Sequence, residues 1–221
     1  MAYVYNINSR RSFFSSISVN TFLILITVFS FVLFSILIQL NIISIDSVAI
    51  KPSNIIQGKY LWTFITSMFM HGGFLHLFMN MLSLFFIGGL VERLIGRKRY
   101  FWFYIISGLF AGLIFVLLSL IFTSDYNTFA VGASGAIFGI VGVLVFLTPN
   151  LPVYVMFIPI PIKMKYAAPG ILIVLWIISI TANIGIGNTA HLGGLVAGLI
   201  YGFYLRKKYK RKTAMISKYF S

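Results

Sequence analysis

The sequence predicts an all-α membrane protein with six transmembrane helices and with both termini in the cytoplasm. Of its 221 residues, 60% are hydrophobic and only 9% are charged, and the mean hydropathy is +1.00. A soluble domain carries about 25% charged residues, so this chain has too few of them to cover a water-soluble fold. The apolar residues gather in segments that can cross a bilayer, and the basic residues gather beside these segments.

Six apolar segments follow one another, separated by more polar connections. The fourth is short, about 14 residues or roughly 21 Å as a helix, and Pro149 and Pro152 close it. The sequence shows no internal repeat, so we expect one six-helix domain at 21–205, after a cytoplasmic segment at 1–20 and before a basic cytoplasmic tail at 206–221. The helices are expected at about 21–43, 75–95, 100–122, 134–147, 169–184 and 190–205.

The distribution of basic residues predicts the orientation of these helices. If the N-terminus is cytoplasmic, fifteen of the seventeen Lys and Arg residues fall on the inner side, and only Lys51 and Lys59 fall outside. Such a bias is typical of a multi-pass protein of the cell membrane with six spans. It also explains the net charge of +14 without a nucleic-acid partner, and we expect none.

The polar residues of the apolar segments gather at one predicted depth. His71, His76 and Asn80 open the second segment, Ser134 opens the fourth, and His191 opens the sixth. In the predicted orientation all of them lie near the extracytoplasmic ends of their helices. Polar groups inside a membrane bundle are costly and are usually functional, so we expect a site that opens to the extracytoplasmic side.

Ser134 is the candidate nucleophile. It lies between residues with almost no side chain, which let other backbones approach it closely. Gly135, Gly139 and Gly142 continue this small-residue face down the fourth helix. The alternative for Ser134 alone is a hydroxyl that bonds to its own helix.

His191 is the candidate base. Gly194 and Gly198 follow it at i+3 and i+7, so His191 lies on or beside a glycine face that brings another helix close. If that neighbour is the fourth helix, His191 meets Ser134 and can take its proton, with the ring of Phe138 stacked beneath the imidazole. Alone, His191 could equally be an interfacial histidine.

A Ser-His dyad is predicted rather than a triad, because no carboxylate is placed to reach His191. Asp46 and Asp125 lie in outer connections, and Glu92 lies near the inner end of the second helix, where a neighbouring arginine is its expected partner. His76 and Asn80 share a helix face at i and i+4. With the backbone N–H of Ser134 they could form an oxyanion hole.

Three histidines could also suggest a metal site. The chain has no cysteine, and no carboxylate accompanies the histidines. We therefore expect no metal and no cofactor.

Three motifs, in this order, resemble those of a known family: His71-x4-His76-x3-Asn80, Gly132-Ala133-Ser134-Gly135 and Ala190-His191-Leu192-Gly193-Gly194. The chain is similar to the rhomboid intramembrane serine proteases. The resemblance implies that Ser134 is the nucleophile, that His191 is the base, and that His76, Asn80 and the Ser134 amide form the oxyanion hole. The supporting residues would be His71, Phe138, Gly132, Gly135 and Gly194.

By this resemblance the protein is expected to be a serine endopeptidase that hydrolyses peptide bonds in or near the transmembrane segments of membrane proteins, its partners being these substrates and the lipid bilayer. The alternative is a catalytically silent rhomboid-like protein that only binds membrane proteins. Its mark would be loss of Ser134 or His191, and both are present. The expected substrate gate is the fifth helix, which carries Trp176, or the connection at 185–189. The oligomeric state is left open.

Overall fold

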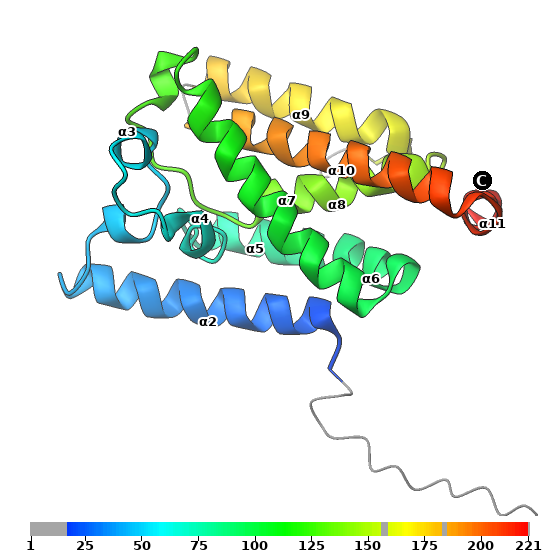
Figure 1. The fold of residues 1–221 in the computed structure, drawn as a ribbon, viewed down its shortest axis with the longest axis horizontal. Helices are drawn as coiled ribbons and strands as arrows, with labels where there is room; N and C mark the ends of the chain where they lie inside the picture. Colours follow the sequence, from blue (N-terminus) through cyan, green and yellow to red (C-terminus); the bar gives the residue numbers. More distant parts are fainter. Residues whose placement is uncertain (1–16, 156–158, 183–184, 221) are drawn as a thin grey trace, which may run out of the picture.

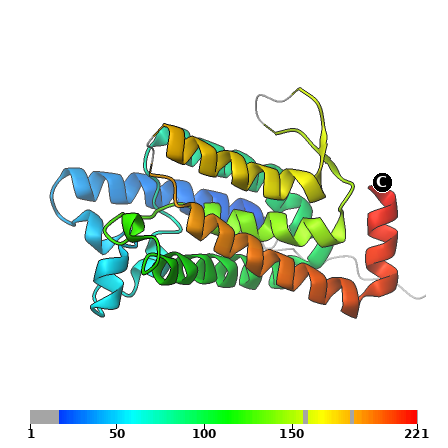
Figure 2. The ribbon, with the colours of Figure 1, turned by 90° about the horizontal axis from the view of Figure 1, so that it is seen from above.

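The computed structural model describes residues 17–155, 159–182 and 185–220. Most of the predicted cytoplasmic segment at 1–20 therefore lies outside the described residues. The described chain is a bundle of long helices lying side by side (Figure 1), and Figure 2 shows the same bundle from above.

The described chain contains helices of different lengths and two short strands. The longer ones are joined by short helices and by one two-stranded hairpin. In chain order their bounds are α2 (Val19–Gln39), η1 (Ile45–Ser47), α3 (Pro52–Ile56), α4 (Thr63–Thr66), α5 (Phe74–Ser83), η2 (Leu84–Gly88, a π-helix), α6 (Gly89–Ile95), α7 (Arg97–Leu118), η3 (Thr123–Asp125), α8 (Ser134–Leu147), β1 (Pro152–Val153), β2 (Ile162–Lys163), α9 (Met164–Thr181), α10 (Asn188–Lys208) and α11 (Lys210–Tyr219).

Each predicted apolar segment coincides with a helix. Four candidate spans are long and apolar enough to cross a bilayer: α2, the continuous run from α5 through η2 to α6, α7 and α9. The helix α8 is apolar but shorter, and α10 ends in three basic residues. The fold is therefore that of a helical membrane bundle, and the count of six spans stays a prediction.

Several helix boundaries differ from the prediction, since α2 ends at Gln39 and α7 at Leu118, each about four residues early. The fifth helix was expected to begin at about Pro169, but α9 begins at Met164 and contains Pro169. Burial of Met164, Ala167 and Ala168 holds the first turns in place, so the loss of one backbone hydrogen bond at the proline does not end the helix. The helix α10 also continues past residue 205, and α11 follows it.

The helix α8 is the centre of the bundle. Eleven of its 14 residues are buried, and it packs against α7, α9 and α10. An apolar helix that is buried on all sides needs no polar face. Its N-terminal residue, Ser134, is half-buried at the end of this central helix.

The α8–α10 contact is formed by backbones with little between them. A methyl group at Gly194 would collide with the carbonyl oxygen of Gly135, and one at Gly198 with that of Gly139. Such close packing requires small residues on both helices. The two glycine faces seen in the sequence thus do meet.

At the other end of the bundle, Glu92 joins α6 to the start of α2. Its carboxylate accepts the backbone N–H groups of Val19 at 2.9 Å and Asn20 at 2.8 Å. The Nε of Arg97 lies 3.6 Å from the same carboxylate. The expected arginine partner is present, but Glu92 also caps α2, because a carboxylate is stabilised at a helix N-terminus.

The loop between α2 and α5 is tied to the segment that precedes α8. Ile50 and Ala130 form an isolated β-bridge, and Gly132 donates its N–H to the carbonyl of Ser67 at 2.8 Å. These bonds fix the chain that leads into Ser134.

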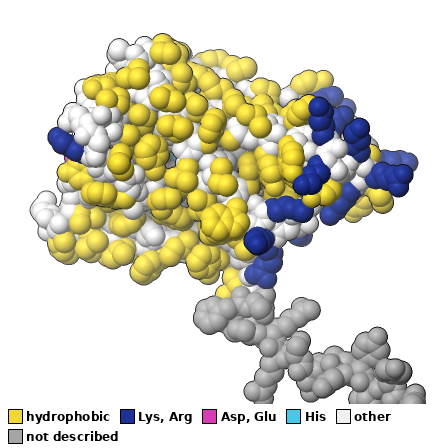
Figure 3. All heavy atoms as spheres, viewed as in Figure 1, with side chains coloured by type: hydrophobic (Ala, Val, Ile, Leu, Met, Phe, Trp, Pro, Cys, Tyr) yellow, Lys and Arg dark blue, Asp and Glu magenta, His cyan; other side chains and the backbone are white. Residues whose placement is uncertain are grey.

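The surface separates by residue type along the bundle. Figure 3 shows hydrophobic side chains over most of one face, with Lys and Arg side chains gathered at the end where α10 meets α11. Apolar flanks with a basic end are what a bilayer-spanning bundle requires.

Candidate active site

Ser134 is the first residue of α8. The preceding residue, Ala133, is the N-cap and has no side chain that could bond to the helix. The first N–H groups of a helix have no intrahelical acceptor, so the Ser134 amide is available to a ligand. The positive end of the helix dipole lies at the same point and favours negative charge.

His191 contacts Ser134 across the α8–α10 packing. Its Nε2 lies 2.7 Å from Ser134 Oγ, which is the distance of a hydrogen bond. The imidazole stacks on Phe138, with ring centroids 4.7 Å apart and an angle of 20° between the planes. His191 is only 7% exposed, so packing orients the ring toward the serine.

No carboxylate among the described residues hydrogen-bonds to His191, whose buried Nδ1 lacks a partner there. Asp46 accepts from Asn54 Nδ2 at 2.7 Å. Asp125 comes closer than the sequence suggested: its Oδ2 accepts the hydroxyl of Thr189 at 3.0 Å. It therefore holds the start of α10 two residues before His191, without contacting the imidazole.

His76 is placed to donate a hydrogen bond beside Ser134. Its Nδ1 accepts the N–H of Gly72 at 3.3 Å, so a neutral ring carries its proton on Nε2. A Cβ built on Gly132 would lie 2.9 Å from His76 Nε2 and 3.6 Å from Ser134 Oγ. The two side chains thus lie on either side of Gly132.

Asn80 is buried one turn further along α5. One N–H of its amide donates to the backbone carbonyl of His76 at 2.8 Å, which leaves the second N–H for another acceptor. The structure gives Asn80 no hydrogen bond to Ser134 among the described residues. Its part in an oxyanion hole stays a prediction.

His71 supports the segment before Ser134 through a hydrogen bond to its backbone. Its Nε2 accepts the N–H of Ala133 at 3.4 Å, and its ring meets that of His76 edge to face at 5.0 Å. His71 is fully buried. It therefore links the segment that leads into Ser134 to the ring of His76, without a hydrogen bond to Ser134 Oγ among the described residues.

The supporting glycines have separate roles. Gly132 has a φ of +122°, a conformation that L side chains rarely adopt. Gly135 fits against Ala111 on α7, where an added Cβ would lie 2.7 Å from that side chain. Gly194 fits against the Gly135 carbonyl, so these glycines let three helices converge at the serine.

Trp176 lies away from this group. It is half-buried on α9 and packs against the hydrophobic core. Within the described chain it shares no hydrogen bond or ring contact with Ser134 or His191. The connection at 185–189 lies closer, because the Gly187 carbonyl accepts the N–H of His191 at 3.0 Å.

Fold and site together define a multi-pass helical membrane protein with a serine-histidine pair at the buried start of a central helix. Residues 58–208 match the Rhomboid domain. The chain belongs to the rhomboid family, which includes serine intramembrane proteases.

Known relatives come from plants and bacteria. "RHOMBOID-like protein 6, mitochondrial" of Arabidopsis thaliana is 36% identical over 162 residues, which cover 71% of this chain and 48% of the relative. "Putative rhomboid protease YdcA" of Bacillus subtilis (strain 168) is 29% identical over 168 residues, covering 76% and 78%. "Rhomboid protease GluP" of the same bacterium is 32% identical over 155 residues, covering 67% and 26%. The match spans less than half the length of the plant relatives.

Proposed function

We propose that this protein is an intramembrane serine endopeptidase that works by a Ser134–His191 dyad. The observation that carries the proposal is the 2.7 Å distance between His191 Nε2 and Ser134 Oγ. A serine hydroxyl becomes a useful nucleophile only when a base within this distance takes its proton. The kinship with bacterial proteins named rhomboid proteases supports the same reaction class.

The reaction follows from the geometry. Ser134 Oγ attacks the scissile carbonyl carbon while His191 Nε2 takes the hydroxyl proton. The negative oxygen of the tetrahedral intermediate accepts hydrogen bonds from the Ser134 amide, from His76 Nε2–H and from the free N–H of Asn80. His191 returns its proton to the leaving amine, the C–N bond breaks, and an acyl-enzyme remains on Ser134.

Water completes the cycle. It attacks the acyl carbon while His191 takes a proton from the water; His191 then returns this proton to Ser134 Oγ as the Ser134–acyl bond breaks, which releases the carboxylic acid. Phe138 and the N–H···O=C bond to Gly187 keep the imidazole in place through both halves. No carboxylate is needed as an orienting group in this scheme.

The proposed topology is six spans with both termini in the cytoplasm, within the cell membrane. The basic residues at one end of the bundle support it. Ser134 then lies toward the extracytoplasmic side. Substrates are transmembrane helices whose carbonyls are hydrogen-bonded within the helix, so the scissile stretch must unwind before it reaches the serine.

The proposed entry route passes α9 or the connection at 185–189. The buried residues of α9 are Met164, Ala167, Ala168 and Leu172, all in its first half, and its second half exposes Ile173, Ile177 and Ile180. Moving it disturbs little buried surface, which suits a gate. The 185–189 connection contacts His191 directly, because the Gly187 carbonyl accepts the His191 backbone N–H.

A proteoliposome assay tests the function. The purified protein is reconstituted with a single-span model substrate that carries Gly and Ala near its outer end, and the products are identified by mass spectrometry. We expect cleavage by the wild type and none by Ser134→Ala. A substrate that co-purifies with the wild type but is never cut, in protein shown to be folded, would instead establish the silent membrane-protein-binding alternative.

A further inference from the structure

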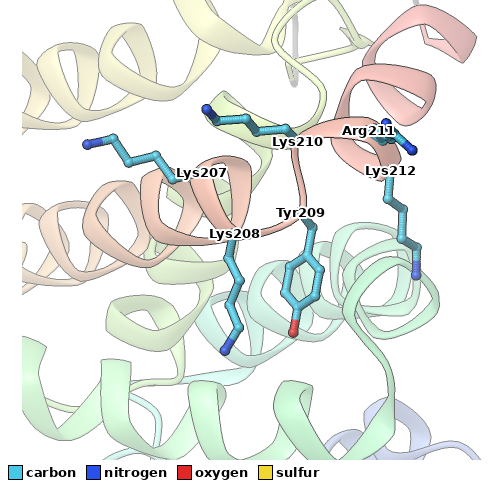
Figure 4. Close-up of a pocket in the computed structure, with 6 residues that line it drawn as sticks. All are labelled: Lys207, Lys208, Tyr209, Lys210, Arg211 and Lys212. Carbon is cyan, nitrogen blue, oxygen red and sulfur yellow. The ribbon is translucent and has the colours of Figure 1, made fainter.

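The basic end of α10 forms a corner with α11, opposite the end that carries the active site. Six of the seven residues at 206–212 are Lys or Arg. Between α10 and α11 the surface has an open hollow of about 590 Å³. Its lining residues are Lys207, Lys208, Tyr209, Lys210, Arg211 and Lys212 (Figure 4).

The protein has almost nothing with which to neutralise this corner. The whole chain holds three acidic residues. Asp46 and Asp125 are bonded to Asn54 and Thr189 at the opposite end. Glu92 is already used by Arg97 and by the start of α2. None of the three carboxylates is therefore bonded to a residue of the corner.

The side chain of Tyr209 holds two like charges close together. Arg99 donates to the Tyr209 hydroxyl at 3.0 Å, and its guanidinium carbon lies 5.2 Å from the ring centroid. Lys208 Nζ lies 5.8 Å from the same centroid. Lys208 Nζ also donates to the Tyr204 hydroxyl at 2.7 Å. The rings of Tyr204 and Tyr209 thus hold two cations at this corner, and an anion beside them would lower their mutual repulsion.

The helix α11 crosses the end of the bundle instead of continuing α10. It is seen end-on in Figure 1 and lengthwise in Figure 2, across the long axis of α10. If α10 crosses the bilayer, α11 lies along its surface. Arg211, Met215 and Tyr219 share one face at i, i+4 and i+8, and Met215 and Tyr219 are 74% and 84% exposed. Such a helix inserts apolar side chains among lipid headgroups.

We propose that the α10–α11 corner binds the phosphate headgroup of an anionic phospholipid in the leaflet opposite the active site. The basic side chains bind the phosphate, and Met215 and Tyr219 reach the acyl-chain boundary. In the view of Figure 4, Lys207 and Lys210 extend to one side of the turn, and Lys208 and Lys212 to the other. The corner therefore presents basic side chains in two directions around the turn.

The proposal goes beyond the excess of positive charge that orients membrane proteins. Every basic residue at this end contributes to a general electrostatic attraction for anionic lipid. Binding at a headgroup site depends instead on the residues of the corner. Lys98, Lys163 and Lys165 lie at the same end, are exposed, and do not line the hollow. They provide a charge-matched control.

The test is lipid binding by the full-length protein in neutral detergent, measured by native mass spectrometry. The probes are short-chain phosphatidylglycerol, phosphatidylcholine of the same chain length, inorganic phosphate and a polyglutamate peptide. We expect phosphatidylglycerol to bind at least about tenfold more tightly than phosphatidylcholine. The combined variant Lys210→Gln, Arg211→Gln, Lys212→Gln should lose at least about tenfold in affinity for phosphatidylglycerol.

The combined control variant Lys98→Gln, Lys163→Gln, Lys165→Gln should change that affinity less than about twofold. An equal loss in both triple variants would overturn the proposal, because it would reveal only a general field. Inorganic phosphate or polyglutamate binding as tightly as phosphatidylglycerol would also overturn it. If the corner variant does not fold, Arg211→Gln alone should still weaken binding about threefold to tenfold, and unchanged binding would contradict a headgroup site.

Discussion

At the scale of single residues, the account depends on the backbone around Ser134 as much as on its side chain. The chain reaches the serine through Gly132, whose N–H is bonded to the Ser67 carbonyl and whose Cα lies against His76. Ala133 is held by the imidazole of His71. Ser134 then begins α8 with a free amide, so position and electrostatics are set before any substrate binds.

Gly132→Ala tests this backbone. The added methyl would lie 2.9 Å from His76 Nε2 at a φ of +122°, so either the ring or the serine segment must move. We expect kcat/KM for a model substrate to fall about a hundredfold and the free energy of unfolding to fall by about 1–3 kcal/mol.

The matched control for that change is Gly170→Ala on α9, where the added methyl meets open space. Its activity should stay within about twofold of the wild type, because a helical Gly→Ala change without a clash is tolerated or mildly stabilising. A Gly132→Ala protein with wild-type kcat/KM would show that the close approach to His76 does not matter.

Asp125→Asn tests the tie to the start of α10. The substitution replaces the charged acceptor of the Thr189 hydroxyl, which lies two residues before His191. We expect kcat to fall about threefold to tenfold with KM nearly unchanged, because the base is displaced and substrate contacts are not. Steady-state kinetics on folded protein measures the two parameters separately.

Asp46→Asn is the control for Asp125→Asn, since Asp46 is also an outer-loop carboxylate but bonds to Asn54. It should leave kcat within about twofold. If Asp125→Asn lowers only the melting temperature and leaves kcat intact, its role is structural.

At the residue level, helix periodicity indicates which side chains share a face, and the catalytic roles assigned to them stay predictions. Spacing of four along α10 placed His191 beside the glycine face, and one turn of α8 placed Phe138 below Ser134. The bonds from Asp125 to Thr189 and from Glu92 to the start of α2 join segments 64 and 73 residues apart. No periodicity within one helix signals such pairs.

At the scale of helices, the pairing of α8 with α10 positions the dyad. The glycines of α10 lie directly against backbone carbonyls of α8, with no flexible side chains between the two helices. A serine on one helix and a histidine on the other therefore meet with little freedom to separate. The α8–α10 contact is the element on which the site depends.

Gly198→Ala tests this contact two turns below the dyad. The added methyl collides with the carbonyl oxygen of Gly139, and a backbone atom cannot move aside as a side chain can. The helices must separate, so we expect a loss of about 1–3 kcal/mol in stability and a large loss of activity. Unfolding in detergent gives the first quantity, and cleavage of the model substrate gives the second.

The control is again Gly170→Ala, which places a methyl on a long apolar helix without a collision and should not be destabilising. A Gly198→Ala protein as stable and as active as wild type would mean that α8 and α10 are not held by glycine packing. Repacking by flexible neighbours is not available there, since the facing atoms are backbone.

Helix existence could be predicted from apolar runs, while some boundaries could not. The start of α8 at Ser134 was predicted from the small residues Gly132 and Ala133 that precede the apolar run. The start of α9 did not, because Pro169 resembles an N-terminal proline until the burial of Met164 is known. The π-helix at Leu84–Gly88 and the tie between Ile50 and Ala130 also escaped prediction, since both depend on backbone bonds.

At the scale of the whole molecule, the two ends of the bundle have different tasks. One end carries the serine, the histidines and the loops bonded around them, and the other carries most of the basic charge. The apolar flanks between them fit a bilayer. The charge distribution that predicted this arrangement is readable in sequence because membrane topology is set by the placement of Lys and Arg.

The most direct test of the central claim is labelling by a fluorophosphonate probe, which reacts with activated serines. The protein is incubated with the probe in detergent as wild type, as Ser134→Ala and as His191→Ala, each shown to be folded by circular dichroism. The account predicts labelling of the wild type that is lost in both variants, because the nucleophile and its base are each required. Labelling that survives Ser134→Ala, or that persists unchanged in His191→Ala, would contradict it.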